Sequence, residues 1–444
     1  MKRNEFNTKF GVIAATVGSA VGLGNIWRFP YEAGVHGGGA FLLLNLIFVL
    51  ILGIPVICAE FVIGRHSRCD VYGAFARFKG GKPWQAIGWL GIFAAILILG
   101  FYSVVAGWTM EYIYQSVISF GGAASSDELH LRFVDFASSP SKPLVWTLLF
   151  ILVNFAILIR GVEKGIEKMS NILLPALFIM LLAFVVNSLF LSEASQGLSF
   201  LFKPDFSKIT PAVILGAMGQ AFFSLSLGLG CLITYSSYFK SDTPLVKTAV
   251  TSALLDMTVA IMAGMIIFPA VFTFGARPAA GPQLVFEVLP SIFMDMNAGM
   301  LWAALFFILL FVASLTSTIS MFEIVISFLV RSRGWGRLKA VTLTSAVVII
   351  LSSLCSLSFG PLKEVTVCGF SFFNLFDYLS SNICLPVGGM MISIFAGWVI
   401  DRKIVRKELL DSNTPLMRFC VKAISFSLRY IAPACIALVF IFGL

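Results

Sequence analysis

The stretch Gly18-Ser-Ala-Val-Gly-Leu-Gly-Asn25 lies in the middle of an apolar segment long enough to cross a membrane. Its glycines weaken a helix, because each costs roughly 1 kcal/mol relative to alanine. A second stretch, Ser224-Leu-Ser-Leu-Gly-Leu-Gly230, interrupts another apolar segment in the second half of the chain. In hydrocarbon, unwound backbone is tolerated only where it is buried in protein or lines a cavity. Two such interruptions, at corresponding positions in the two halves of the chain, predict the binding site of an ion-coupled carrier.

The composition is that of a multi-pass membrane protein. Of 444 residues, 59% are hydrophobic and 12% are charged, whereas soluble domains average about 25% charged residues. Apolar runs of about 20 residues predict an all-α integral membrane fold. The eleven expected transmembrane helices fall near residues 10–34, 40–64, 86–118, 144–160, 167–190, 209–237, 243–275, 299–330, 338–357, 370–400 and 418–443.

The basic residues lie mainly on one side of these crossings. With the N-terminus inside, the interior segments hold 24 of the 31 Lys and Arg residues, in agreement with the positive-inside rule. We therefore expect a multi-pass protein of the cell membrane with a cytoplasmic N-terminus and an extracytoplasmic C-terminus. The net charge of +9 then reflects this topology and contact with anionic lipids of the bilayer, and not nucleic-acid binding.

The crossings divide into two groups of five. Each group, residues 10–190 and residues 209–400, begins with a broken helix. An odd number of helices per group forces opposite orientations, which predicts a 5+5 inverted repeat with broken helices 1 and 6. We therefore expect a single transmembrane transporter domain over residues 1–444, with an extra helix 11 at 415–444 outside the repeat.

Several oxygen-bearing residues have the types that a dehydrated cation requires. Carbonyls freed by an unwound helix supply some ligands, and amides and hydroxyls of neighbouring helices supply the rest. The candidates for a first cation site are Ala20, Asn25, Ser224 and Asp256. Hydroxyls of the run Ala313-Ser-Leu-Thr-Ser-Thr-Ile-Ser320 can complete a second site with carbonyls of Gly18 and Val21. For each hydroxyl alone, bonding back to the carbonyl four residues earlier is the alternative.

Three motifs resemble those of the neurotransmitter:sodium symporters, which include the bacterial leucine transporter. They are Gly22-Leu-Gly-Asn-Ile-Trp-Arg-Phe-Pro30, Gly37-Gly-Gly-Ala-Phe41 and Gly219-Gln-Ala-Phe-Phe-Ser-Leu-Ser-Leu-Gly228. The resemblance extends over nearly the whole chain, and eleven helices match a bacterial amino-acid transporter branch of the family. It implies sodium-coupled import of a small-molecule amino-acid substrate by alternating access.

The resemblance also implies which residues bind ions and substrate. A first sodium site uses the four candidates above, and a second uses Gly18, Val21, Ala313, Thr316 and Ser317. The substrate carboxylate meets backbone amides near Leu23 and Gly24 and the hydroxyl of Tyr102. Its amino group meets carbonyls around Phe223, Ser224 and Ser226. The other substrate-binding residues are Ala20, Ile98, Val105, Leu229, Ser317 and Met321.

The residue at position 24 narrows the expected substrate class. Monoamine members of the family have an aspartate there, whereas Gly24 provides no negative charge, so a zwitterionic amino acid fits and a monoamine does not. The apolar side-chain pocket cannot satisfy a charged side chain. Leu229 stands where the leucine transporter has a phenylalanine, which leaves a smaller wall. We expect large hydrophobic or aromatic L-amino acids.

Asp256 is the most diagnostic charge in the sequence. An ionised group at membrane depth is costly and usually marks a functional site, although an Asp hydrogen-bonded for packing is the structural alternative. Animal relatives have asparagine here and use chloride to offset the charge of sodium. A fixed carboxylate replaces that chloride, so we expect no chloride requirement. Protonation of Asp256 in the empty carrier is less costly in a dry site, which motivates a second hypothesis of proton counter-transport.

The resemblance implies two gates. Arg28 and Asp377 form an outer ion pair that opens and closes, with static anchoring as the alternative role. At the inner side Arg3, Ser237 and Tyr238 match the gate motif, but Arg331 occupies the place of the expected acidic partner. The segment 276–298 is expected to fold partly back as a lid, or else to be an ordinary loop.

Three other functional classes remain to be weighed. A non-transporting amino-acid sensor needs no second coupled ion, so two complete sodium sites argue against it. The sequence has no clustered His, Cys or nucleophile–base set, which argues against an enzyme. A buried pocket with gates at both ends argues against a channel. The oligomeric state stays open.

Overall fold

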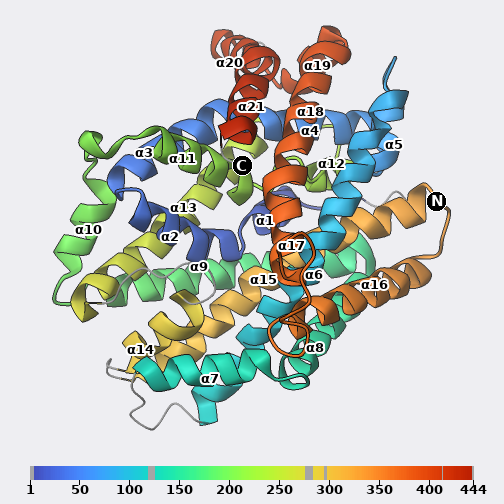
Figure 1. The fold of residues 1–444 in the computed structure, drawn as a ribbon. Coiled ribbons are helices and arrows are strands. Elements are labelled where there is room, and N and C mark those ends of the chain that lie inside the picture. Colours follow the sequence, from blue (N-terminus) through green and yellow to red (C-terminus); the bar gives the residue numbers. More distant parts are fainter. Residues whose placement is uncertain (1–4, 119–125, 276–283, 295–297, 413, 443–444) are drawn as a thin grey trace.

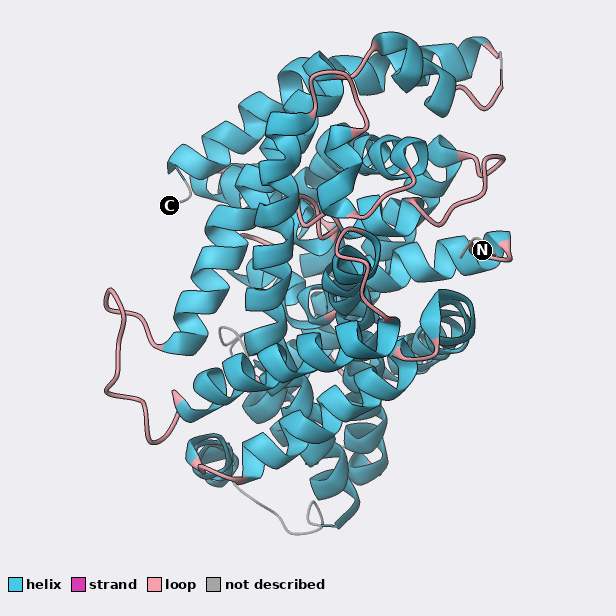
Figure 2. Ribbon diagram, turned by 90° about the vertical axis from the view of Figure 1, so that its right-hand side faces the viewer, coloured by secondary structure: helices cyan, strands magenta, loops and turns pink. Residues whose placement is uncertain are grey.

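The computed structural model describes residues 5–118, 126–275, 284–294, 298–412 and 414–442. Within these ranges the chain is helical, with two isolated bridges and no strand (Figure 2). Eight continuous helical segments are long and apolar enough to cross a membrane, and two bent helix pairs raise the number to ten. The all-α membrane class is therefore confirmed. The predicted sixth crossing is not among the ten, because it is divided into two short helices, so the count of eleven stays a prediction.

The helices that form the expected crossings begin and end within a few residues of the predicted ranges. They are α1 (Lys9–Ala20) with η1 (Gly24–Arg28) and α2 (Phe29–Val35), α3 (Gly39–Phe48) with η2 (Val49–Gly53) and α4 (Ile54–Ser67), η3 (Lys82–Trp84) with α6 (Gln85–Ile118), α8 (Lys142–Leu158), η4 (Val162–Glu167) with α9 (Lys168–Ser188), α11 (Pro211–Ser224) with α12 (Cys231–Ser236), α13 (Leu245–Phe274), α15 (Gly299–Arg331), α16 (Arg337–Leu357), α17 (Phe372–Tyr378) with η7 (Leu379–Cys384), α18 (Leu385–Ile394) and η8 (Phe395–Val399), and α20 (Pro415–Phe426) with η9 (Ser427–Ile431) and α21 (Ala432–Phe442).

Shorter helices lie in the connections between these crossings. They are α5 (Val71–Ala76), α7 (Ser126–Ser138), α10 (Ala194–Phe202), η5 (Phe206–Lys208), η6 (Leu284–Val288), α14 (Leu289–Met294) and α19 (Arg402–Leu409). The described part of segment 276–298 does fold back onto the protein. Phe286 is fully buried there and stacks on Phe133, with ring centroids 5.8 Å apart.

The long helices α6 and α15 pack along each other at the centre of the bundle (Figure 1). Each is apolar around most of its circumference, which is typical of a helix surrounded by other helices. α8 and α16 also pack against α6, whereas α1 and α9 pack against α15. Since α12 also packs against α15, one arm of each broken helix lies beside this central helix.

The first predicted break separates α1 from η1, and the two arms differ in direction by 57°. Its polar backbone groups are satisfied by side chains of other helices. Ser317 Oγ donates to the carbonyl of Val21 (2.9 Å), and the amide of Leu23 donates to Tyr102 Oη (3.0 Å). These bonds replace the helical partners that the break removes, as burial away from water requires.

The second predicted break separates α11 from α12 and contains Gly228 and Gly230, both with positive φ (86° and 78°). The amide of Gly228 donates to Glu60 Oε1 (3.0 Å) on α4. A Cβ atom on Gly228 would collide with the backbone carbonyl of Leu385. Glycine is therefore required at position 228 both for its backbone conformation and for the close approach of α18.

A buried carboxylate fixes the N-terminal end of α1. Glu167 accepts hydrogen bonds from the amides of Asn7 (2.9 Å) and Thr8 (3.1 Å), and Thr8 Oγ1 accepts from the amide of Gly11 (2.9 Å). Amides at a helix start lack helical partners, and negative charge there is favourable. Glu167 thus ties the first arm of the broken helix to the start of α9.

We expect Gly228→Ala to destabilise the protein, because alanine adds left-handed backbone strain of about 1–2 kcal/mol and a steric clash with α18. Gly219→Ala is the matched control, since a Cβ there meets nothing within 4 Å. Thermal unfolding in detergent should show a lower midpoint for Gly228→Ala and an equal or higher one for Gly219→Ala. Equal midpoints for the two variants would contradict this account of the second break.

Candidate functional site

A small buried pocket lies between the two breaks, with a volume of about 40 Å³. It is lined by Ala20, Gly22, Gly24, Ile98, Phe101, Tyr102, Phe223, Ser224, Ser226, Leu229, Ser317, Met321 and Leu385. Ten of the twelve predicted substrate-binding residues are in this set. The pocket is far smaller than ligand sites of about 300–1,000 Å³, so a bound amino acid requires the walls to move apart.

The two predicted residues outside this set, Leu23 and Val105, line a second chamber of about 230 Å³ that adjoins the pocket. Val105 lies one helical turn beyond Tyr102 on α6, which places its side chain in the chamber and not against the pocket. Its assignment to the side-chain pocket therefore stays a prediction. The amide of Leu23 still points at Tyr102, as described above, so the expected carboxylate-binding groups do lie together.

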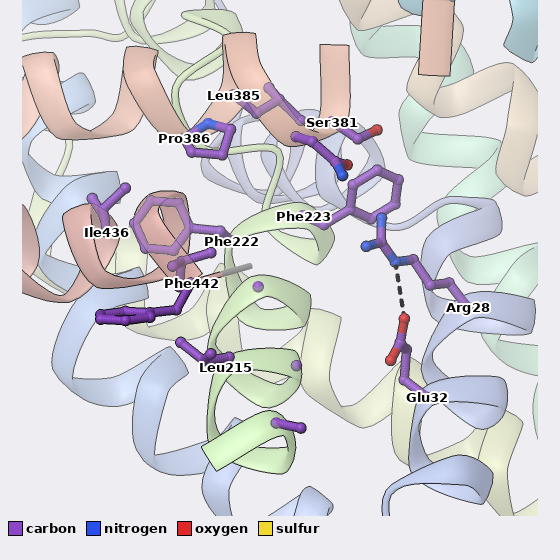
Figure 3. A pocket seen from close by; sticks show the side chains of 15 residues that line it. Arg28, Glu32, Leu215, Phe222, Phe223, Ser381, Leu385, Pro386, Ile436 and Phe442 are labelled. Atoms are coloured by element: carbon purple, nitrogen blue, oxygen red, sulfur yellow. Dashed lines mark ion pairs between the residues drawn. The ribbon is translucent and has the colours of Figure 1, made fainter. Parts of the chain in front are cut away.

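Phe223 lies at the boundary between the pocket and the chamber, because it lines both, as do Gly24, Phe101 and Tyr102. The guanidinium carbon of Arg28 lies 4.2 Å from the centroid of the Phe223 ring. A cation over an aromatic face is attracted by the negative charge of the ring face. Figure 3 shows the Arg28 guanidinium group beside Phe223 and joined to Glu32. Arg28 and Phe223 together therefore cover the pocket.

The expected ion pair of Arg28 with Asp377 is not formed in this structure. Arg28 Nε lies 3.7 Å from Glu32 Oε1, four residues along the same helical arm, and Asp377 Oδ1 accepts a hydrogen bond from Ser381 Oγ (2.9 Å). Both predicted gate residues line the chamber. The physical reason is the chamber itself, which separates α2 from α17 and leaves each charge with a partner on its own helix.

A further hollow of about 300 Å³ lies beside the chamber, between α11, α18 and α21 (Figure 3). Phe222 and Leu385 contribute to its wall, and so do Ile436 and Phe442 of the last helix. Its lining is predominantly apolar. The last helix therefore borders the outer approach to the site, although the predicted repeat does not include it.

Asp256 lies at the centre of the predicted first cation site. Its Oδ1 accepts from Asn25 Nδ2 (2.8 Å), and its Oδ2 accepts from Ser224 Oγ (2.6 Å). Asn25 Nδ2 also lies 2.9 Å from Ser224 Oγ, and Asn25 Oδ1 accepts from the amide of Gly22 (3.0 Å). Asp256 is 1% exposed and Asn25 is fully buried. The structure thus brings three predicted oxygen ligands from three helices to one point, which suits a hard cation.

The predicted second cation residues also lie together, between α1 and α15. Thr316 Oγ1 donates to the carbonyls of Val312, four residues earlier (3.3 Å), and Ala313 (3.0 Å), and Ser317 Oγ donates to Val21 as described. A Cβ atom on Gly18 would lie 3.3 Å from Thr316 Cβ, so the two helices are in close contact there. Thr316 makes the local back-bond named as the alternative, whereas Ser317 instead bonds across to the break.

The inner end of the site is closed by packed rings and charges. Tyr238 Oη donates to Glu323 Oε1 (2.7 Å), and Glu323 Oε2 lies 2.8 Å from Arg337 Nη2. The guanidinium carbon of Arg331 lies 4.3 Å from the centroid of the Tyr238 ring. Of the other predicted inner-gate residues, Ser237 accepts a hydrogen bond at Oγ from Arg331 Nη1 (2.8 Å), and Arg3 lies outside the described residues. Tyr238 is therefore held by Glu323, a fully buried carboxylate of α15.

Sequence reasoning missed three pocket residues, Gly22, Phe101 and Leu385. Gly22 belongs to the quoted glycine motif, and Phe101 precedes Tyr102, so both were within reach of the pattern. Leu385 comes from α18, and no local signal in the sequence indicates that it approaches the second break. It does so because glycine at 228 allows α18 to come close.

The chain is similar to known transporters over most of its length. The model of the sodium:neurotransmitter symporter family matches residues 3–121 and 132–444. An uncharacterized sodium-dependent transporter of Bacillus subtilis (strain 168) is 36% identical over 438 residues, which cover 98% of this chain and 97% of the relative. An uncharacterized sodium-dependent transporter of Haemophilus influenzae is 37% identical over 454 residues, which cover 100% of this chain and 98% of the relative. These proteins are transporters and not enzymes.

A solved structure agrees closely with the fold. The crystal structure of MhsT in complex with L-phenylalanine matches with a TM-score of 0.91 and 42% sequence identity, and the match covers 99% of each chain. The broken helices, the pocket between them and the extent of these matches lead to one assignment. The chain belongs to the sodium:neurotransmitter symporter family and is a sodium-dependent membrane transporter.

Proposed function

We propose that this protein imports hydrophobic or aromatic L-amino acids together with sodium by alternating access. The observation that carries the proposal is the double role of Ser224. Its side chain lines the pocket between the breaks and donates a hydrogen bond to the carboxylate of Asp256. A substrate in the pocket and a cation at Asp256 would therefore share a ligand, and shared contacts make the two binding free energies depend on each other.

The lining of the pocket supports the substrate class. Ile98, Phe101, Leu229, Met321 and Leu385 form apolar walls, and such walls cannot satisfy a charged side chain. The polar groups gather at the two breaks, where Tyr102 and the Leu23 amide suit a carboxylate. The MhsT structure, which holds L-phenylalanine, is consistent with an aromatic substrate.

We further propose two sodium sites, at Asp256 and between α1 and α15, and no chloride requirement. The buried carboxylate of Asp256 provides the negative charge that offsets one sodium ion. When sodium leaves at the inner side, a proton on Asp256 would keep the site neutral, since an unpaired buried charge costs several kcal/mol. Proton counter-transport is therefore part of the proposal.

The transport cycle requires the outer gate to close over the filled pocket. Arg28 would leave Glu32 and pair with Asp377, while Phe223 stays between the gate and the substrate. The inner contacts of Tyr238 would then open to release substrate and sodium. We also propose that residues 10–190 and 209–400 form an inverted repeat, with the N-terminus inside and the C-terminus outside.

Proteoliposome uptake tests the proposal against the alternative of a non-transporting sensor. With sodium outside only, uptake of L-phenylalanine, L-leucine, L-tryptophan and L-tyrosine should be at least tenfold above that with equimolar external potassium. An inward sodium gradient drives uptake only if sodium moves with the substrate. Sodium-dependent binding without uptake would instead assign the protein as a sensor, and preferential uptake of lysine or glutamate would contradict the apolar pocket.

The substitution Asp256→Asn removes the negative charge and keeps the shape of the side chain. Ser224 can then accept a hydrogen bond from the new amide, so the local geometry is kept. We expect wild-type uptake to be equal in chloride and gluconate, and the variant to lose at least tenfold in both its uptake and its apparent sodium affinity in gluconate. Chloride should restore part of both losses.

Asp242→Asn is the matched control, because Asp242 is an exposed carboxylate on the loop before α13. It should behave like the wild type in both salts. Asp256 does not replace chloride if wild-type uptake requires chloride. The same conclusion follows if uptake by Asp256→Asn is equal in chloride and gluconate.

Gly24 provides a test of substrate class. A Cβ atom there would lie 2.7 Å from Phe223 Cε1, so Gly24→Ala measures the steric effect alone. Gly24→Asp adds a negative charge beside the substrate carboxylate, and like charges at an interface cost several kcal/mol. We expect Gly24→Asp to bind L-phenylalanine at least tenfold more weakly than Gly24→Ala, and to shift its relative preference toward 2-phenylethylamine. Equal losses in the two variants would show that the carboxylate does not bind near position 24.

A further inference from the structure

A basic pocket lies far from the substrate site, at the start of the last crossing. Its volume is about 660 Å³. It opens between α19 and the helix formed by α20 and η9, and α19 and α20 are seen at the top of Figure 1. This end of the last crossing is on the side that the distribution of Lys and Arg predicts to be cytoplasmic.

Two rows of cations face this pocket. Arg402 and Arg406 are four residues apart on α19, and Arg418 and Lys422 have the same spacing on α20, so each pair projects from one side of its helix. Arg429 of η9 is a fifth lining cation. No Asp or Glu is among the lining residues that the structure describes. The nearby carboxylate of Glu408 is engaged elsewhere, 2.6 Å from Arg65 Nε.

The pocket is apolar beneath these charges and aromatic at its edge. Val405, Val421 and Leu428 line it and are buried. Phe426 and Tyr430 also line it, but they are 56% and 51% exposed. Trp398, which is 59% exposed, packs on Tyr430 with a centroid distance of 5.7 Å. Trp398 ends the crossing Phe372–Val399, and an exposed Trp at the end of a crossing is typical of the level of lipid headgroups.

Arg429 connects the basic and the aromatic parts of the pocket. Its Nε donates to the carbonyl of Gly397 (2.6 Å), and its guanidinium carbon lies 5.8 Å from the Trp398 ring centroid. The side chain is therefore anchored at the mouth next to the exposed aromatic residues. A ligand held by the cations would have its remaining length beside Phe426 and Tyr430, where an acyl chain of the bilayer lies.

We propose that this pocket binds the headgroup of one anionic phospholipid. The phosphodiester would contact the Arg402–Arg406 and Arg418–Lys422 pairs, since guanidinium and ammonium groups are the usual phosphate partners, and an acyl chain would follow Phe426 and Tyr430. Basic pockets between transmembrane helices bind such headgroups in other proteins. A second copy of this chain is a poor occupant, because its net charge is also positive (+9).

The test uses the full chain in a non-ionic detergent, titrated with dioctanoyl phosphatidylglycerol, dioctanoyl phosphatidylcholine or glycerol 3-phosphate. Lipid adducts are counted by native mass spectrometry, and thermal unfolding gives apparent dissociation constants. The variant is Arg402→Gln/Arg406→Gln. Lys403→Gln/Lys407→Gln on the same helix is the matched control, because it removes the same charge from residues that do not line the pocket.

We expect phosphatidylglycerol to bind at least tenfold more tightly than phosphatidylcholine. The arginine variant should lose about tenfold or more in phosphatidylglycerol affinity, since each nearby cation contributes about 1 kcal/mol, and the lysine control should change by less than about twofold. Equal binding of the two lipids, or equal losses in the two variants, would overturn the proposal. Glycerol 3-phosphate binding as tightly as the lipid would show a simple anion site, and dimers abolished only by the arginine variant would assign the pocket to a second copy.

Discussion

Unwound backbone inside a membrane must have its amides and carbonyls satisfied by the protein, and the rest of this structure depends on that constraint. Tyr102 and Ser317 form hydrogen bonds with backbone groups of the first break, and Glu60 does so with the second. Each comes from a helix that is not itself broken. Two of these three side chains, Tyr102 and Ser317, also line the pocket. The groups that make the breaks stable thus place polar atoms around a cavity that is otherwise apolar.

The same constraint places the proposed cation site beside the proposed substrate site. Asp256 is buried from solvent and keeps only neutral partners, Asn25 and Ser224. Hydrogen bonds from neutral groups do not remove its charge, so a cation at this point has more to gain than one at the surface. Because Ser224 also borders the pocket, a substrate there lies beside the bound charge. Reciprocal coupling then follows from contact, without a long path through the protein.

The breaks could be predicted from the sequence, because the free-energy cost of glycine in a helix depends on the residue itself and not on distant contacts. Most pocket residues followed, since family motifs fix which helix positions face the breaks. Val105 lines the chamber and not the pocket, because its depth in the bundle depends on how α6 is positioned, which the local sequence does not reveal. The partner of Arg28 was missed for a related reason. The spacing of Arg28 and Glu32 allows a local pair, whereas the distance to Asp377 is set by the chamber between two helices. Leu385 has no local signal, because its position depends on close packing at Gly228.

The two ends of the site differ in how firmly they are held. At the outer end Arg28 and Glu32 are partly exposed, and exposed pairs contribute about 0–1 kcal/mol. At the inner end Glu323 is fully buried and paired with Arg337, and breaking a buried pair costs about 3–5 kcal/mol. Movement of Arg28 toward Asp377 is therefore inexpensive, whereas opening around Tyr238 is not. In the proposed transport cycle, binding free energy from sodium and substrate would therefore be needed mainly at the end around Tyr238, which would stay closed until the pocket is filled.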